Sequence, residues 1–213
     1  MAIITICFGS WSAVRSRHLN RRLAYSTVSQ LAYIVFGITL MTADSFKGSM
    51  SHMLFHGIVK IVLFYTAGAI LYTNHKEFVD DIEGFAYKMP KTFALFTISS
   101  VSLIGIPPLA GFLSKYTLAT AAVKEMSAGN ILPFLGVCAL MFSVFMTAIY
   151  LLEIITKAYF PSKDFDRESL DHVKEAPVKL WGPMAVITAV MVSVTFWSTP
   201  LFNFLETVAK GVF

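Results

Sequence analysis

The sequence predicts an all-α polytopic membrane protein with about five transmembrane helices, a truncated helix before them and one broken helix. Three observations lead to this class. Of the 213 residues, 56% are hydrophobic and only 14% are charged, and the mean hydropathy is +0.67, which is too apolar for a soluble globular domain. Apolar stretches of bilayer length alternate with short charged segments. A double proline interrupts the longest apolar stretch.

The apolar stretches follow one another along the chain. Residues 1–14 are apolar but fall short of the roughly 20 residues that a straight crossing needs, so the chain is expected to begin partway into a helix. The full spans are expected at 23–42, 51–73, 132–159 and 180–200. Cys7 and Cys138 lie inside apolar runs, which favours packing over a disulfide or a metal site.

The stretch 92–123 is too long for one straight span and too short for two spans with a turn. Its middle holds Gly105, Pro107, Pro108 and Gly111. Consecutive prolines remove backbone donors and push the preceding residue out of the helical region, so we expect one crossing made of two half-helices. Unwound backbone in a membrane lines a water-filled cavity or is buried in protein, although a simple packing kink remains the alternative.

Ionisable side chains occur inside two of these stretches. His52, His56 and Lys60 are four residues apart, so they share one face of a helix. Lys115 follows the double proline at membrane depth. Because an ionisable group in the bilayer is costly without a partner or water, this row predicts a functional path through the interior of the bundle. An interfacial role for His52 is the alternative, since it lies nearer a helix end.

Further polar residues are expected to support the path. Ser26, Ser29, Gln30 and Tyr33 recur at helical spacing and form a polar stripe. The side chains that we expect to connect the ionisable groups, together with water, are Ser29, Gln30, Tyr33, Tyr65 and Thr66. Glu153 and Lys157 are four apart near a helix end, where an ion pair is favoured over a second part of the path.

The distribution of basic residues sets the expected topology. If 92–123 crosses once, one side of the membrane receives most of the basic residues: Arg15, Arg17, Arg21, Arg22, Lys76, Lys88, Lys91, Lys163, Arg167, Lys174 and Lys179. The other side receives only Lys47, Lys124 and Lys210. The positive-inside rule then places 15–22, 74–91 and 160–179 in the cytoplasm, and it explains the net charge of +4 without a nucleic-acid partner.

Three motifs together resemble a known family. They are RLAYSTVSQ at 22–30, the His52, His56 and Lys60 spacing, and GIPPLAGFLSK at 105–115. They are similar to the antiporter-like, proton-translocating subunits shared by respiratory complex I, energy-converting membrane-bound hydrogenases and Mrp-type Na+/H+ antiporters. The resemblance covers residues 1–159 and implies the C-terminal half of such a subunit, the second of two inverted five-helix repeats. Residues 160–179 would then be a cytoplasmic loop, and 180–213 an additional C-terminal transmembrane helix.

The resemblance also implies a role for the ionisable residues. Lys60 would belong to a central hydrophilic axis, Lys115 would be the lysine of the broken helix, and the histidines would link them. Asn20 departs from the pattern, because many relatives carry a lysine there. The implied function is a proton-translocating half-channel in a redox-driven complex of the inner membrane, without catalysis or cofactor in this chain. Other membrane subunits would supply the first repeat and the iron–sulfur, nickel or quinone sites.

Two other functions remain open at this stage. The motifs are shared with Mrp-type antiporters, so transport of Na+ against protons is an alternative. A more remote one is an intramembrane metalloenzyme with His52 and His56 as a zinc pair. No third ligand is apparent in the sequence, and Lys60 would repel a cation.

Overall fold

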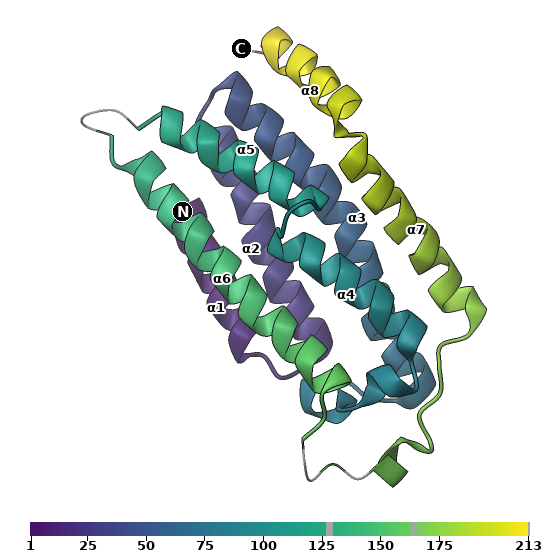
Figure 1. Cartoon of the computed structure of the whole chain (residues 1–213). Helices are drawn as coiled ribbons and strands as arrows, with labels where there is room; N and C mark the ends of the chain where they lie inside the picture. The colour runs from purple at the N-terminus through teal and green to yellow at the C-terminus, as the bar shows by residue number, and fades with distance from the viewer. Residues whose placement is uncertain (127–129, 163–164, 166, 213) are drawn as a thin grey trace.

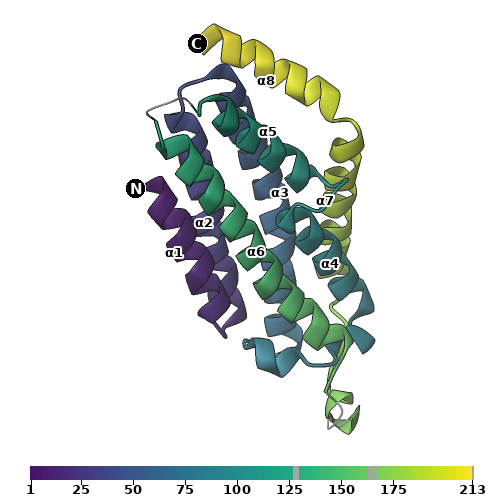
Figure 2. The same cartoon turned by 60° about the vertical axis from the view of Figure 1, so that its left-hand side comes forward.

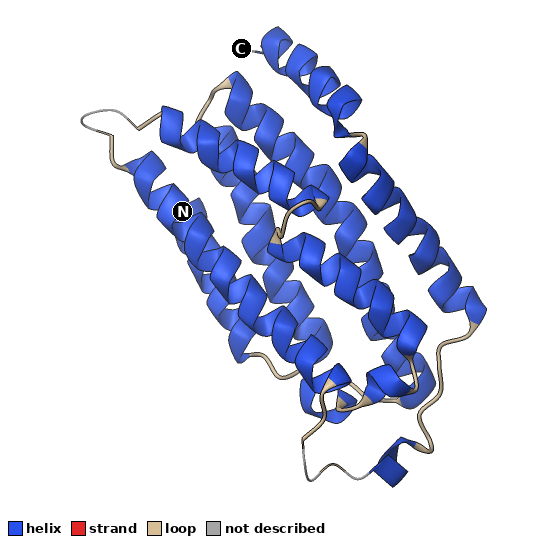
Figure 3. Cartoon of the chain, viewed as in Figure 1, coloured by secondary structure: helices blue, strands red, loops and turns tan. Residues whose placement is uncertain are grey.

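The structure is a computed structural model that describes residues 1–126, 130–162, 165 and 167–212. Within these ranges the regular structure is helical, without a β-sheet, which confirms the predicted class (Figure 3). The α-helices are α1 (Ala2–Arg15), α2 (Leu19–Thr39), α3 (Ala43–Asn74), α4 (Pro90–Ile104), α5 (Ala110–Lys124), α6 (Leu132–Tyr159), α7 (Val178–Phe196) and α8 (Ser198–Val212). Three short 3-10 helices lie in loops: η1 (Val79–Ile82), η2 (Phe85–Tyr87) and η3 (Arg167–Leu170).

The helices form an elongated bundle. Helices α2, α3 and α6 run along most of it, the shorter α1 packs against α2 and α6, and α4 and α5 lie end to end between α3 and α6 (Figures 1 and 2). Helix α7 packs along α3 and α4 on one flank, and α8 lies over the upper end of α3. Two apolar clusters form the core, one around α3, α4, α6 and α7 and the other around α1, α2, α5 and α6.

In the part of the chain that the structure describes, three helices are long and apolar enough to cross a membrane individually. They are α3, α6 and α7. Helix α2 has 21 residues but carries two arginines and a polar stripe. Helices α1 and α4 are apolar but shorter. The structure thus agrees with a polytopic membrane protein, in which α4 and α5 complete a crossing only together.

The predicted break in the stretch 92–123 is present. Helix α4 ends at Ile104, Gly105 adopts a left-handed conformation with φ 93°, and α5 begins at Ala110. Only glycine takes up such a φ at little cost, so this residue ends α4 without strain. Helix α4 starts at the lower end of the bundle and α5 finishes at the upper end, so the pair crosses once (Figure 1).

Helix α3 begins eight residues earlier than the span predicted at 51–73. Its N-cap is Thr42, which shares a capping box with Ser45: the Ser45 amide donates to the Thr42 hydroxyl, and the Ser45 hydroxyl accepts from the Thr42 amide. These bonds satisfy free backbone donors of the first turn. Asp44 and Lys47, which lie between the spans predicted at 23–42 and 51–73, are therefore helical.

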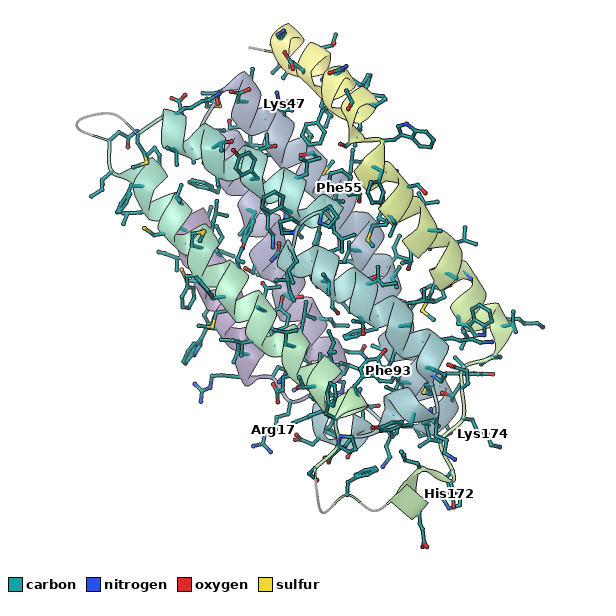
Figure 4. The ribbon with its side chains drawn as sticks, viewed as in Figure 1. Arg17, Lys47, Phe55, Phe93, His172 and Lys174 are labelled. Carbon is teal, nitrogen blue, oxygen red and sulfur yellow. The ribbon has the colours of Figure 1, made fainter. Side chains whose placement is uncertain are left out.

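The charged loops that were expected to share one side of the membrane lie together at the lower end. There, His18 Nε2 lies 2.9 Å from Glu77 Oε2, and the Lys88 ammonium lies 3.7 Å from Asp171. At the upper end, Lys124 donates to Asp44 at 2.6 Å. Figure 4 shows this separation, with Arg17, His172 and Lys174 at the lower end and Lys47 at the upper. Lys163 and the side chain of Arg167, which were assigned to the lower group, are outside the described residues.

The C-terminal segment differs from the single transmembrane helix expected at 180–213. Helix α7 ends at Phe196, and α8 begins at Ser198 after Trp197. Pro200 explains the interruption, because proline cannot supply a backbone donor inside a continuing helix but fits the first turn of a new one. Leu205 and Ala209 of α8 are buried, while Phe204 is 64% exposed.

Candidate functional site

The predicted ionisable row on α3 faces the interior of the bundle. The exposed fractions of His52, His56 and Lys60 are only 2%, 6% and 6%. Helix α3 packs against α2 and α5 on this side. Phe55, which lies between His52 and His56 in sequence, is labelled in the upper half of the bundle in Figure 4. The three ionisable groups that share one face of the predicted helix thus lie inside the bundle.

His52 is held on both ring nitrogens. Its Nε2 lies 3.1 Å from Gln30 Oε1 on α2, and its Nδ1 lies 3.1 Å from Ser114 Oγ on α5. The ring stacks on Tyr33, with centroids 5.3 Å apart, and on His56, at 6.0 Å. Two stacked neighbours and two hydrogen-bonding groups therefore fix the plane of this imidazole.

Lys60 reaches α2 at the first residue of the polar stripe. Its ammonium donates to the Leu23 carbonyl at 2.9 Å and to the hydroxyl of Ser26. The ring of Phe64 lies 5.7 Å from the ammonium. No carboxylate pairs with Lys60 within the described part of the chain. The amine is held by neutral oxygens alone.

Lys115 extends back to the break between α4 and α5. Its Nζ donates to the carbonyl oxygens of Leu103 at 2.6 Å and Ile104 at 3.1 Å. These are carbonyls at the C-terminal end of α4, where the helix dipole is negative and the acceptors have no helical partner. Pro107 and Pro108 have no backbone N–H to donate to these carbonyls, and the lysine binds them instead. Its ammonium also lies 5.6 Å from the ring of Tyr33.

His56 lies between Lys60 and His52 and borders a small cavity. Its Nε2 is buried and has no hydrogen-bonding partner among the described residues. The same holds for the hydroxyl of Ser102 on α4. Both residues line a cavity of about 10 Å³ next to Gly111, which is close to the smallest volume that accommodates one water molecule.

The supporting residues predicted from the sequence fall into two groups. Gln30 contacts His52 directly and continues to Thr147 on α6, at 3.5 Å. Tyr33 stacks on His52 and donates to the Leu140 carbonyl. Ser29 instead contacts the hydroxyls of Ser10 and Ser143, at 2.7 and 3.0 Å, away from the ionisable row.

Two further residues expected to connect the path do not lie on it. Tyr65 is 45% exposed. Thr66 is buried, but it donates to the Val62 carbonyl and to the sulfur of Met184 on α7. Both follow Lys60 by five or six residues, so the helical turn directs them away from α2 and α5.

Glu153 and Lys157 form the expected ion pair, with 3.1 Å between Nζ and Oε1. Each also has a partner that the sequence did not indicate. Glu153 accepts from the buried guanidinium of Arg22 at 2.7 Å, and Lys157 pairs with Asp80 in η1. The hydrogen bond from Lys157, together with the charge of Arg17, holds the pKa of Asp80 below its usual value. This charged network joins the lower ends of α2 and α6 to η1.

Sequence reasoning missed several members of the site. Ser114 was not singled out, although it directly precedes Lys115. Ser26 was noted only as part of a stripe, yet it contacts Lys60. Thr147 and Tyr150 lie on α6 at helical spacing between Ser143 and Glu153, and this polar series in an apolar helix is the signal that could have marked them. The buried position of Arg22 has no such signal.

The arrangement gives no support to a zinc pair. Within the described residues, no three His, Cys, Asp or Glu side chains gather as a metal site would require. The rings of His52 and His56 stack face to face, and Nε2 of His52 is directed at Gln30. What the site does offer is a series of buried amines and imidazoles that are bridged by hydroxyl, amide and carbonyl groups. Such groups accept, hold and release protons.

Comparison with known proteins agrees with this geometry. Residues 1–151 match the family model described as NADH:quinone oxidoreductase/Mrp antiporter, TM. The chain belongs to this family. One relative is NADH-quinone oxidoreductase subunit N of Desulforudis audaxviator, 38% identical over 159 residues, which are 75% of this chain and 30% of that protein. Another is NADH-quinone oxidoreductase subunit L of Rickettsia bellii, 30% identical over 87% of this chain and 27% of that protein. The chain thus spans less than a third of the length of these antiporter-family relatives.

Solved structures share the fold of this family member. The membrane-bound sulfane sulfur reductase, an archaeal respiratory membrane complex, contains a chain with TM-score 0.84 and 25% identity, covering 100% of this chain and 41% of that one. The Mrp complex from Dietzia sp. gives TM-score 0.81 with 21% identity, covering 99% and 46%. Respiratory complex I from Thermus thermophilus gives 0.80 with 22% identity, covering 100% and 44%. The last two likenesses concern the fold alone.

Proposed function

We propose that this chain is a proton-translocating half-channel of a redox-driven membrane complex, and that His52, His56, Lys60 and Lys115 carry the protons. One observation carries the proposal. A row of buried lysine and histidine side chains, without carboxylate partners among the described residues, runs through the bundle and reaches the break between α4 and α5. Charged groups are rare at such depth, and transporters use unwound helix ends of this kind to hold ions.

The geometry supports a stepwise transfer. Lys60 and Lys115 are each bound by neutral oxygens rather than by carboxylates. Because no carboxylate among the described residues pairs with either ammonium, their charge is not fixed by an ion pair, and each amine can pass a proton to a neighbouring group. His56 and His52 lie between the two lysines and stack on each other. A proton that arrives at one group adds a positive charge there. This charge repels the proton on the next charged group and favours its release.

The break between α4 and α5 is the proposed exit. Lys115 binds two carbonyls there while it is charged. After Lys115 loses its proton, its amine has one N–H donor fewer, so a water molecule can donate to one of these carbonyls in its place. The non-helical backbone here is limited to residues 105–109, between the end of α4 and the start of α5. We therefore place the exit from Lys115 at this break.

Relatives favour redox coupling over an antiporter driven by gradients alone. The relative with 38% identity is named as a quinone oxidoreductase subunit, and the solved chain with 25% identity belongs to a respiratory complex. The Mrp likeness, at 21%, concerns the fold. We accordingly place the electron-transfer cofactors, whether iron–sulfur, nickel or quinone, in partner subunits. Other membrane subunits would pack beside this bundle.

The proposed orientation follows from the clustering of basic loops. The segments 15–22, 74–91 and 160–179 carry most of the basic residues, and the contacts between them put the described parts at one end. By the positive-inside rule we place this end in the cytoplasm, and the quinone oxidoreductase relative favours the inner membrane. A cysteine placed at Lys88 or at Lys124 and reacted with an impermeant thiol reagent tests this in whole cells.

Proton uptake by the purified complex in proteoliposomes tests the function. Lys60→Ala removes the amine in the centre of the row, and we expect proton translocation to fall at least tenfold while electron transfer persists or becomes uncoupled. Lys47→Ala is the matched control, because that lysine lies at the upper surface and pairs with Asp44 and Glu206. Full translocation in Lys60→Ala would refute the proposed path.

The same vesicles distinguish a redox-driven complex from an Mrp-type antiporter. A gradient of Na+ imposed without an electron donor drives proton movement only in an antiporter. The subunits and metals that co-purify give an independent answer, since iron–sulfur and nickel or quinone-binding partners are expected for a redox-driven complex.

A further inference from the structure

The amide of Gln30 has only one orientation that satisfies its neighbours. Thr147 donates its hydroxyl hydrogen to the Ser143 carbonyl at 2.7 Å. A carbonyl cannot donate, so Thr147 Oγ1 acts toward Gln30 as an acceptor. The Gln30 group that faces Thr147 must then be its NH2, and the distance is 3.5 Å. Amide orientation is assigned from such networks, and here the network leaves Oε1 to face His52.

This orientation sets the protonation of one nitrogen in His52. Gln30 Oε1 is an acceptor only, and it lies 3.1 Å from His52 Nε2. Nε2 must therefore carry a hydrogen in both the neutral and the charged ring. Gln30 and His52 have exposed fractions of 0% and 2%, so bulk water does not reach this bond.

The other nitrogen, Nδ1, is where a proton is gained and lost. Its partner among the described residues is the hydroxyl of Ser114, at 3.1 Å. That hydroxyl also lies 3.3 Å from the Gly111 carbonyl, one turn earlier in α5. In the neutral ring Nδ1 is an acceptor and Ser114 donates to it. In the charged ring Nδ1 is a donor, and Ser114 accepts from it and donates to Gly111.

We propose that Gln30 holds His52 in its Nε2–H form, so that proton exchange occurs at Nδ1 alone, and that the Ser114 hydroxyl turns between Nδ1 and the Gly111 carbonyl with each exchange. Gln30 is thus a positioning residue. When the ring gains a proton, an N–H bond forms at Nδ1 and the ammonium of a path lysine, Lys60 or Lys115, loses one N–H bond. When the ring releases the proton, the Nδ1–H bond breaks and the receiving amine forms an N–H bond. This inference rests on the proposed function, and it gives the path a direction.

That direction is toward α5. Ser114 directly precedes Lys115, whose ammonium binds the last carbonyls of α4. Gly111 also packs against the Ser102 carbonyl on the other side of the break. The Ser114 hydroxyl therefore donates to the Gly111 carbonyl, in the first turn of α5, in only one of its two positions. A tautomer with the hydrogen on Nδ1 would instead direct the free lone pair to α2, away from Lys115.

Nitrogen NMR of the full chain in lipid bilayers reads the tautomer directly. Protonated and unprotonated ring nitrogens have well-separated shifts, and the chain has only five histidines, so His52→Asn identifies the signals of this residue. We expect neutral His52 to appear only as the Nε2–H form. In Gln30→Met, which lacks the acceptor, we expect the Nδ1–H form to appear beside it.

Ser114→Ala tests the second half of the proposal. We expect the Nε2–H form to persist, the Nδ1 signal to move because its hydrogen bond is lost, and proton translocation by the complex to fall at least tenfold. The control is Ser49→Ala, which removes another fully buried serine hydroxyl that bonds only to a backbone carbonyl of its own helix. It should change neither readout.

Three results would overturn the inference: a neutral Nδ1–H form in the unmodified protein, an unchanged tautomer in Gln30→Met, or full translocation in Ser114→Ala. These failures are distinct from failure of the proposed function. If Lys60→Ala also translocates at the full rate, the function itself is wrong. If Lys60→Ala is inactive and the tautomer differs from the expected one, only the role of Gln30 and Ser114 is withdrawn.

Discussion

The ammonium of Lys115 donates to the Leu103 carbonyl at 2.6 Å, across the gap between two half-helices of one membrane crossing. A side chain of α5 thereby caps the C-terminal end of α4. The lysine has two roles in this position, since it stabilises the break while charged and supplies a titratable group at its centre.

Removal of the Lys115 amine should destabilise the broken helix. In Lys115→Met the carbonyls of Leu103 and Ile104 lose their donor, and hydrogen bonds to a charged group each contribute about 1.5–3 kcal/mol. We expect a lower unfolding temperature for the purified complex or chain, measured by tryptophan fluorescence. An unchanged temperature would show that the two carbonyls find other donors at no cost.

Gly111→Ala should destabilise the protein, because Gly111 lies close to the backbone of Ser102 on the other side of the break. A Cβ at this position would overlap the Ser102 carbonyl oxygen, and overpacking of this kind typically costs about 1–3 kcal/mol. Gly57→Ala is the control, because nothing lies within 4 Å of a Cβ there. That change should leave stability equal or raise it by up to about 1 kcal/mol, since alanine favours the helix. Equal losses in the two variants would contradict the role of Gly111.

Glu153→Gln should destabilise the protein, because the buried Arg22 guanidinium loses its carboxylate partner. The guanidinium is 2% exposed, and Glu153 is its carboxylate partner among the described residues. Without that charge, we expect a loss of about 1–3 kcal/mol in the free energy of unfolding, because Glu153 is itself partly exposed and the pair is partly screened. The double variant with Arg22→Met should lose less than the sum of the two single changes. Glu206→Gln, at an exposed ion pair, should show no measurable loss.

Acid should weaken the lower end of the bundle through Asp80. Its pKa is below the usual value because Lys157 donates a hydrogen bond to it. A lowered carboxyl pKa stabilises the folded state fully above the unfolded value of about 3.9, and this contribution is lost as the pH falls through the lower folded value. We expect the unfolding temperature of Asp80→Asn to depend less on pH below about 4 than that of the unmodified protein. Identical profiles would indicate that the pair contributes nothing.

Much of the site could be predicted from local sequence. The spacing of His52, His56 and Lys60 sets one helical face regardless of what lies opposite, and the double proline must end a helix wherever it lies. Both features follow from backbone geometry within a few residues, and both are present in the structure.

The partners of these groups could not be predicted in the same way. Ser114 and Gln30 contact His52 from helices 62 and 22 residues away, and Arg22 meets Glu153 across 131 residues. Such pairs depend on how the helices pack, which the local pattern does not contain. The capping box at Thr42 is a local signal, and it would have corrected the start of α3.

Proton translocation by Lys115→Arg tests the central claim most directly. Arginine keeps the positive charge and the donors that the carbonyls of Leu103 and Ile104 require, but it does not release its proton in a protein. If Lys115 carries protons, the variant complex in proteoliposomes should keep its unfolding temperature and lose translocation at least tenfold. Translocation at the unmodified rate would contradict the account, because a fixed charge would then suffice at the break.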